Sequence, residues 1–335
     1  MTVLITGGLG FIGSHICVEL LMIGHKVIIL DDLSNSNIEV LYKIEQITHN
    51  KVNLYIDDCK NKKALNKIFK NNKIDVVIHC AGFKAVGESV KDPLKYYENN
   101  LESTISLLQI MCKYNIKKLI FSSTATVYGV PDKCPIDETF KAGNTTNPYA
   151  TTKYMIEEIL KDLYNINKDW SIVILRYFNP IGAHKSGLIG ENPNGTPNNL
   201  MPYILKVASG ELSCLNIFGN DYNTYDGTGV RDYIHVVDLA KAHLKALNKI
   251  DMNNNLSIYN IGTGRGYSVL DVIDTFERVN LIRINYKTVD RRPGDIDEYY
   301  SNPAKAEREL DWKAELDLEE MCKDSWKFYK KEKHL

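Results

Sequence analysis

The stretch TVLITGGLGFIGSHICVELL, residues 2–21, decides the fold of this chain of 335 residues. An apolar run breaks into closely spaced glycines and then resumes with helical periodicity, which predicts a strand, a tight turn and a helix. Gly7 and Gly8 permit the turn, Gly10 lets the backbone approach a pyrophosphate, and Gly13 lets the helix pack closely on the strand. The start of the helix then offers unpaired N–H groups to an anion, so the stretch predicts a dinucleotide site.

A second strand, residues 27–30, leads to an acidic residue that indicates which dinucleotide is bound. Asp31 follows that strand, where a carboxylate accepts hydrogen bonds from the adenosine ribose hydroxyls and repels a 2′-phosphate. No Arg or Lys that would attract such a phosphate follows before Lys43. The sequence therefore predicts NAD as the cofactor and not NADP.

Composition argues against several other classes of protein. Lys and Arg number 41 against 42 Asp and Glu, so no net charge steers the chain toward nucleic acid. The seven cysteines form no CxxC pair, and the eight histidines show no ligand spacing, so we expect no metal and no disulfide framework. The first strand begins at residue 2, and no apolar run approaches the roughly 18 residues of a membrane span. We expect a cytoplasmic protein with no membrane segment.

Strands and helices alternate through the first half of the chain. Strands are expected at 52–56, 75–81 and 118–123, with helical patterns between them, which predicts a Rossmann-type, doubly wound parallel sheet of the α/β class. We expect residues 1–180 to form an NAD-binding domain, with a later segment at about 232–262 interleaved. Residues 181–335 are expected to form mainly a smaller, mixed α/β substrate lobe.

Apolar residues in the expected helix from about 93 to 115 recur at spacings of three and four. Such a stripe indicates either a core face or a dimer face. Its members are Leu94, Tyr97, Leu101, Ile105 and Leu108.

Tyr149 and Lys153 stand four positions apart, after Asn147-Pro148, a pair that favours a helix start. On a helix they share one face. A tyrosine acting as a base near neutrality needs its pKa lowered by roughly 3 units, or about 4 kcal/mol. One ammonium at about 5 Å, with an effective dielectric near 20, supplies about 3.3 kcal/mol. We therefore expect Lys153 to lower the pKa of Tyr149, with the positive charge of oxidised NAD supplying the remainder. With the hydroxyl run 122–124, these residues form an acid–base set.

Nine motifs in this order resemble the UDP-glucose 4-epimerases, a family of extended short-chain dehydrogenases. They are GGLGFIGSH (7–15), AGFKAVGESV (81–90), SSTATVYG (122–129), YATTK (149–153), RYFNPIGAH (176–184), PNNLMPY (197–203), IFGNDY (217–222), GTGVRDYIHV (227–236) and RRPGD (291–295). The resemblance spans nearly the whole chain. It implies interconversion of UDP-galactose and UDP-glucose in galactose metabolism, by reversible C4 oxidation and reduction through a 4-keto intermediate with tightly bound NAD. It also implies a homodimer.

The resemblance assigns roles by position. Tyr149 is the expected acid and base, Lys153 holds the nicotinamide ribose and tunes Tyr149, and Thr124 bonds the reacting sugar oxygen. The expected NAD contacts are Gly7, Gly10, Phe11, Ile12, Gly13, Asp31, Asp32, Asn35, Ser36, Asp58, Cys59, Cys80, Ala81, Gly82, Lys84, Asn99, Ser122, Tyr149, Lys153, Tyr177 and Phe178. The expected UDP-sugar contacts are Thr124, Asn179, Asn199, Leu200, Asn216, Phe218, Arg231, Tyr233, Arg292, Asp295 and Tyr299.

Three of these assignments have chemical consequences of their own. Arg231 and Arg292 are suited to a pyrophosphate, because guanidinium groups form two parallel hydrogen bonds to phosphate oxygens. Thr124 stands where the family usually has serine, which keeps the hydroxyl but adds a methyl that restricts χ1. Tyr299 is expected beside the sugar, where its bulk disfavours N-acetyl hexosamines.

Two alternatives remain open. A nucleotide-sugar 4,6-dehydratase or decarboxylase also begins with C4 oxidation, but a dehydratase typically carries an Asp-Glu pair where this chain has Ala125 and Thr126 after Thr124. A non-catalytic NAD-binding regulator on the same fold would not need the pair Tyr149 and Lys153. Retention of NAD without turnover would indicate the regulator.

Overall fold

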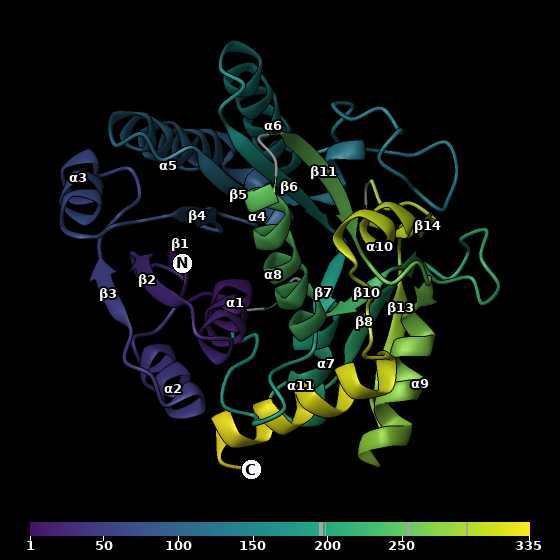
Figure 1. Cartoon of the computed structure of the whole chain (residues 1–335). Coiled ribbons are helices and arrows are strands. Elements are labelled where there is room, and N and C mark those ends of the chain that lie inside the picture. The colour runs from purple at the N-terminus through teal and green to yellow at the C-terminus, as the bar shows by residue number, and fades with distance from the viewer. Residues whose placement is uncertain (194–196, 198, 253–254, 293) are drawn as a thin grey trace.

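The computed structural model describes residues 1–193, 197, 199–252, 255–292 and 294–335. Residue 198 of the motif PNNLMPY and residue 293 of RRPGD lie outside these ranges. A Rossmann-type sheet of seven parallel strands dominates the fold (Figure 1), as the alternating pattern predicted. Its spatial order is β3 (Asn53–Ile56), β2 (Lys26–Asp31), β1 (Thr2–Thr6), β4 (Val76–His79), β5 (Lys118–Thr124), β6 (Ser171–Tyr177) and β11 (Leu256–Ile261).

Helices cover both faces of this sheet (Figure 1). One face packs on α1 (Phe11–Met22), α2 (Glu39–Thr48) and α8 (Val236–Met252). The other packs on α3 (Lys62–Asn71), α5 (Pro93–Lys113) and α6 (Pro148–Ile166). Successive strand residues point to opposite faces, so Val3 and Ile5 of β1 join the first core and Leu4 joins the second. Two short helices, α4 (Val86–Lys91) and the 3₁₀ helix η1 (Ala125–Tyr128), follow β4 and β5.

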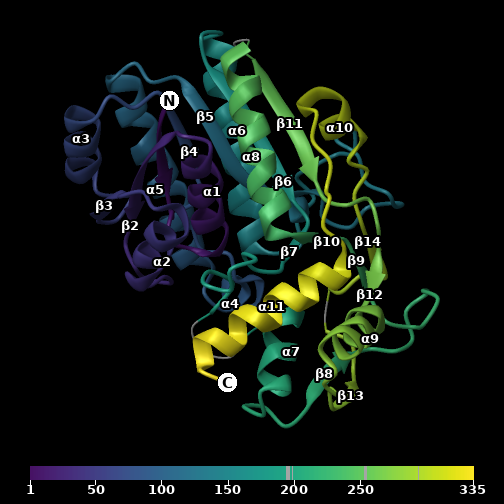
Figure 2. The same cartoon turned by 60° about the horizontal axis from the view of Figure 1, so that its bottom comes forward.

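The second half of the chain builds a lobe with its own core at one end of the sheet (Figure 2). Its strands form three small sheets: β7 (Asn179–Ile181) with β10 (Tyr233–His235), β8 (Leu215–Phe218) with β13 (Tyr286–Val289), and β9 (Val230–Arg231) between β12 (Tyr267–Ser268) and β14 (Glu298–Tyr299). Its helices are α7 (Leu200–Ala208), α9 (Val269–Asn280) and α11 (Leu318–Lys333), whereas α10 (Ala304–Leu310) packs on β11 and α8 of the large sheet. Phe276 and Met321 are fully buried between α9 and α11.

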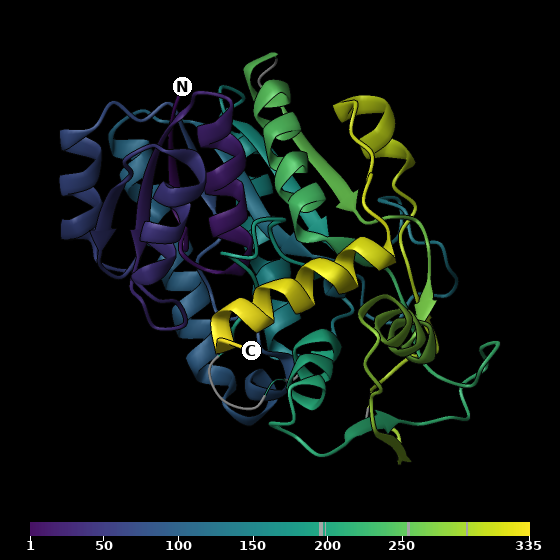
Figure 3. The same cartoon turned by 90° about the horizontal axis from the view of Figure 1, so that it is seen from below.

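Helices α8 and α11 both join the lobe to the large sheet. After β10 the chain returns through α8, which packs on α1, and adds β11 beside β6. Helix α11 lies across the junction (Figure 3), and its Glu332 pairs with Lys43 of α2 at 2.6 Å.

Candidate active site

The glycine turn between β1 and α1 leaves space on its outer side. Gly7 has a φ of +69°, a conformation that L side chains rarely adopt. A Cβ on Gly13 would lie 2.1 Å from the Gly7 carbonyl oxygen, so only glycine permits this close packing of helix and turn. A Cβ on Gly10 would meet only that same oxygen, at 3.4 Å, and Gly10 caps α1 without a side-chain hydrogen bond. The turn and the start of the helix, with Phe11 and Ile12, thus fit the pyrophosphate of a dinucleotide.

Asp31, at the end of β2, anchors two loops. Its buried carboxylate accepts hydrogen bonds from the Leu9 N–H at 2.9 Å, the Leu33 N–H at 3.0 Å and the Ser36 hydroxyl at 2.6 Å. It therefore joins the glycine turn to the loop after β2. Two further expected cofactor contacts in that loop, Asp32 and Asn35, are exposed.

The next two strand ends supply further predicted cofactor contacts. Asp58, after β3, accepts from the Lys60 N–H at 2.8 Å, whereas Cys59 is buried and burial raises the pKa of its thiol. After β4, Lys84 lies 5.6 Å from the centre of the Phe11 ring. The Lys84 ammonium also pairs at 2.9 Å with Glu191, a residue that the sequence did not indicate.

A buried asparagine that the sequence analysis missed holds the loop after β4. Asn100, beside the predicted contact Asn99, accepts from the Phe83 N–H at 2.8 Å and donates to the Phe83 carbonyl at 3.1 Å. Its amide also donates to Thr152 of α6 at 3.0 Å. The signal that could have revealed it is the polar set Asn100, Ser103 and Thr104 on one face of α5, which is buried. This residue joins the loop carrying Gly82 to the helix carrying Tyr149.

Helix α6 begins as predicted, with Asn147 accepting from the Ala150 N–H at 2.9 Å and Pro148 in the first turn. The Lys153 ammonium is buried against β5, where Nζ donates to the Ser122 carbonyl oxygen at 2.8 Å. The same Nζ lies 4.9 Å from the centre of the Phe121 ring. The helix thus brings Lys153 to the end of β5.

Thr124 completes the acid–base set. Its hydroxyl accepts from the Thr126 N–H at 3.2 Å at the start of η1, and its side chain also hydrogen-bonds to Tyr149. The structure therefore brings together the three residues expected to be catalytic, Thr124, Tyr149 and Lys153.

The pKa of Tyr149 differs from the expectation. Burial raises it to about 12, and the hydrogen bond with Thr124 opposes that rise. Burial also lowers the pKa of Lys153 to about 8, and the neighbouring Cys80 and Glu157 side chains oppose that fall. The expectation that Lys153 depresses the tyrosine pKa is therefore wrong for the chain by itself, because removing the phenolate from water outweighs a lysine that bonds to Ser122.

The strand ends of β4 and β6 complete this edge of the sheet. Cys80 and Ala81 follow β4, and burial raises the pKa of the Cys80 thiol to about 12. After β6, the ring of Phe178 packs 5.7 Å from that of Tyr299. The buried Tyr177 hydroxyl lies 2.6 Å from His243 Nε2, and its side chain also interacts with Ser122 and Cys80, which are themselves predicted cofactor contacts.

The predicted contacts to the sugar nucleotide come mainly from the second lobe. Arg231 pairs with Tyr299 across β9 and β14, and its Nη1 donates to the Val230 carbonyl at 2.8 Å. Arg292 pairs with Asp295 at 2.9 Å and covers the ring of Phe218 at 4.8 Å. Arg231 and Arg292 both lie close enough to Tyr222 and Tyr233 to act on the pKa values of these tyrosines.

Five other predicted contacts are more dispersed. Asn179 and Asn199 are exposed, and Asn199 donates to Glu191 at 3.4 Å beside Leu200, the first residue of α7. Asn216 is half-buried in β8. Tyr233 belongs to the buried core of the lobe, and burial raises its pKa to about 12.

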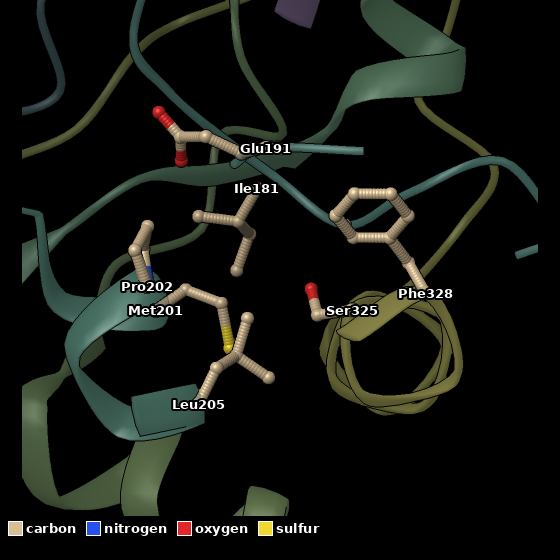
Figure 4. A pocket seen from close by; sticks show the side chains of 8 residues that line it. Ile181, Glu191, Met201, Pro202, Leu205, Ser325 and Phe328 are labelled. Carbon is tan, nitrogen blue, oxygen red and sulfur yellow. The ribbon is translucent and has the colours of Figure 1, made fainter. Parts of the chain in front are cut away.

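Glu191 also borders a small pocket between α7 and α11 (Figure 4). The other side chains there are mainly apolar, and the Glu191 carboxylate extends away from the Phe328 ring. The pocket contains none of the predicted catalytic residues. It is a packing gap at the edge of the site.

Within the described ranges, no group of three or more His, Cys, Asp or Glu side chains could hold a metal ion. The helices of those ranges include none long and apolar enough to cross a membrane.

The predicted contacts follow the carboxyl ends of the parallel strands β1 to β6, beside an acid–base pair, which is the arrangement of a dinucleotide-dependent enzyme of the Rossmann class. A model of the NAD dependent epimerase/dehydratase family matches residues 3–262. The chain belongs to this family, and its near relatives within it are UDP-glucose 4-epimerases.

Three of these relatives show how far the similarity extends. The UDP-glucose 4-epimerase of Bacillus subtilis is 55% identical over 98% of this chain and 96% of its own length. The crystal structure of the Bifidobacterium longum enzyme, in complex with NAD+ and UDP, has a TM-score of 0.96 at 52% identity, covering 99% of this chain and 98% of that one. The Stenotrophomonas maltophila enzyme, with bound NAD and formylated UDP-arabinopyranose, has a TM-score of 0.98 at 46% identity, covering 100% and 99%.

Proposed function

We propose that this protein interconverts UDP-galactose and UDP-glucose by reversible oxidation and reduction at C4 of the hexose. The observation that carries this proposal is the convergence of Thr124, Tyr149 and Lys153 beside the glycine turn, at the carboxyl edge of the sheet. Full-length similarity to UDP-glucose 4-epimerases supports the same reaction.

The residues present fit NAD. The open side of Gly10 accommodates the pyrophosphate, and the Asp31 carboxylate, with two oxygens and three protein donors, retains capacity to accept from a ribose hydroxyl. Lys153 is placed to hold the nicotinamide ribose, and Lys84 supplies a cation beside Phe11. When bound, NAD supplies the acceptor and donor of the C4 hydrogen.

Tyr149 moves the proton. As phenolate, its oxygen takes the proton of the sugar 4-hydroxyl and returns it after the 4-keto sugar has turned over. The Thr124 hydroxyl orients the same sugar oxygen. Because burial raises the pKa of Tyr149 to about 12, a positive charge beyond that of Lys153 must stabilise the phenolate. Oxidised NAD carries that charge, so the base is active only in the oxidised complex.

The second lobe binds the nucleotide part of the substrate. Arg231 and Arg292 are suited to the pyrophosphate, with Asp295 holding the second guanidinium in place. Phe178 and Tyr299 form an aromatic wall beside the residue after Thr124. A tight hold on UDP and a loose hold on the hexose allow the keto sugar to present either face.

A dehydratase would need a carboxylate beside the Thr124 hydroxyl to eliminate water. In the structure, Thr124 leads into η1, whose residues Ala125–Tyr128 include no acid. This observation favours the epimerase over the dehydratase.

The helical face formed by α4, α5 and α6 fits a homodimer interface. Large apolar side chains are exposed there: Val86, Val90, Leu94, Ile105 and Met155. A second copy packing on these helices would bury them. Sedimentation velocity would test the dimer, and a monomer at micromolar concentration would contradict it.

We also propose a cytoplasmic location, which the free cysteines fit.

The test of the catalytic assignment is Tyr149→Phe. Loss of a positioned acid–base group should lower kcat by about 10² to 10⁴-fold while the purified protein keeps its NAD. The matched control is Tyr164→Phe on the same helix, which should retain full activity. A Tyr149→Phe variant with normal turnover would contradict the assignment, whereas wild-type protein that holds NAD but never turns over would indicate the regulator.

A further inference from the structure

A buried ion pair lies one helical turn beyond the acid–base residues. The side chains of Glu157 in α6 and Arg176 in β6 are 0% and 3% exposed. The carboxylate accepts from Arg176 Nε at 3.0 Å and from its Nη2 at 2.5 Å. It also accepts from the Ser123 hydroxyl of β5 at 2.6 Å. One carboxylate of the helix therefore binds two neighbouring strands of the sheet.

The same face of α6 holds three successive residues of β5. Tyr149, Lys153 and Glu157 recur every four positions and so lie on one face of the helix. Within residues 122–124, Lys153 donates to the carbonyl of the first, Glu157 accepts from the hydroxyl of the second, and Tyr149 bonds to the side chain of the third. A shift at one of these contacts would change the other two.

We propose that Glu157 is a positioning residue for the reaction: held by Arg176, it fixes α6 against β5 and so sets the placement of Tyr149 relative to Thr124. The planar, two-pronged contact of guanidinium and carboxylate has a defined geometry, unlike an apolar contact. A buried pair of this kind adds little net stability over an apolar pair, so orientation is its principal effect. This inference rests on the proposed epimerase reaction.

A second effect of Glu157 is electrostatic. The groups that act on or lie against Lys153 are His79 and Cys80 at the end of β4, Phe121 and Ser122 of β5, and Tyr149 and Glu157 of its own helix. Burial lowers the pKa of His79 to about 3 and raises that of Cys80 to about 12, so both are neutral near pH 7. Glu157 is the carboxylate of this set, and its charge raises the pKa of Lys153.

The experiment compares three variants of the full-length protein with its NAD. Glu157→Gln keeps the shape and removes the charge, Ser123→Ala removes only the bond to β5, and Asp238→Asn changes a buried carboxylate elsewhere, which accepts from two backbone N–H groups. Each is measured for kcat and KM with UDP-galactose across pH, for NAD content, and for Tm.

For Glu157→Gln we expect kcat to fall about 10-fold or more with KM and NAD content little changed, because misplacement affects the reacting geometry. The alkaline limb of its kcat profile should move to lower pH by about half a unit or more, since Lys153 loses a neighbouring negative charge. Ser123→Ala should lower kcat by about 3-fold without moving the alkaline limb of the kcat profile. Asp238→Asn should lower Tm alone.

Four outcomes are decisive. Wild-type protein without turnover contradicts the proposed function itself. If the wild type is active and the kcat profile of Glu157→Gln across pH matches it, the positioning role is wrong. The role is also wrong if Glu157→Gln loses kcat only in proportion to its loss of Tm, with no shift of the alkaline limb. If Glu157→Gln does not fold, normal kcat in Ser123→Ala overturns it.

Discussion

The Tyr299 hydroxyl donates a hydrogen bond to the carbonyl oxygen of Ala125, the residue after Thr124. This bond attaches the second lobe to the end of β5 and fixes the tyrosine ring against Phe178. A wall placed in this way limits the room beside the sugar.

Substrate choice follows from that wall. We expect turnover of UDP-galactose and UDP-glucose to exceed that of UDP-N-acetylglucosamine by about 10-fold or more, because an acetamido group must displace a packed ring. Tyr299→Phe, which keeps the ring, should retain the preference. Competing-substrate assays measure it, and equal kcat/KM values for the two hexose types would contradict it.

Cofactor retention depends on Asp31. Asp31→Asn replaces an acceptor of three protein hydrogen bonds by a group with one acceptor oxygen. A bond to a charged group contributes about 1.5–3 kcal/mol, so NAD affinity should fall about 10-fold or more. NAD released per subunit after heat denaturation measures this. Asp75→Asn, which alters an acceptor for the Thr2 N–H at the opposite edge of the sheet, is the control and should keep its NAD. A full complement of NAD in purified Asp31→Asn would contradict the assignment of Asp31 as an NAD contact.

Substrate binding depends on Arg292. Arg292→Met should raise KM for UDP-galactose about 10-fold or more with a smaller effect on kcat, because a guanidinium contact to pyrophosphate is present before and during reaction. The neighbouring Arg291 pairs with Asp221 instead, at 2.7 Å. Arg291→Met is therefore the matched control. Equal KM values for Arg292→Met and Arg291→Met would contradict the assignment of Arg292 to substrate binding.

Acid stability depends on buried histidines. Burial lowers the pKa of His15 and His79 to about 3 and that of His243 to about 4. The unfolded chain binds these protons near pH 6.5 and the folded chain does not, so stability falls as pH drops from about 6.5 toward 4. Each histidine contributes up to about 1.4 kcal/mol per pH unit.

Urea unfolding at about pH 7 and pH 5 measures that slope. His243→Gln should reduce it, whereas the same change at the exposed His49 should not. An unchanged slope in His243→Gln would show that this residue takes up its proton in the folded protein.

The parts of the fold fixed by local rules were predictable from the sequence. The glycine turn between β1 and α1, the strand alternation and the helix start at Asn147 each follow from backbone geometry, and they lie as expected with one exception. Gly8, unlike Gly7, has no positive φ, and a Cβ there would instead meet the Ile29 side chain at 2.8 Å. The stripe on α5 was expected to be either a core face or a dimer face. Leu94 is 77% exposed and Ile105 39%, so the core reading is wrong for both. The face of α5 that packs toward the sheet includes Tyr96 and Asn100. Their polar groups form hydrogen bonds, so these buried residues do not belong to an apolar pattern and the pattern did not predict them.

The sequence predicted which residues form the site, but not which groups their side chains contact. Spacing alone placed Tyr149 and Lys153 on one face, yet it could not show that the ammonium bonds to the Ser122 carbonyl. The sequence also did not predict the ion pair between Glu157 and Arg176, because it joins a helix and a strand that lie apart in sequence.

The central claim is that hydrogen leaves and returns to C4 within one binding event. Purified protein, incubated with UDP-galactose and no added NAD, should yield UDP-glucose by chromatographic separation, without net accumulation of NADH absorbance. Stoichiometric NADH with an oxidised sugar nucleotide, or no UDP-glucose from NAD-containing protein, would contradict it.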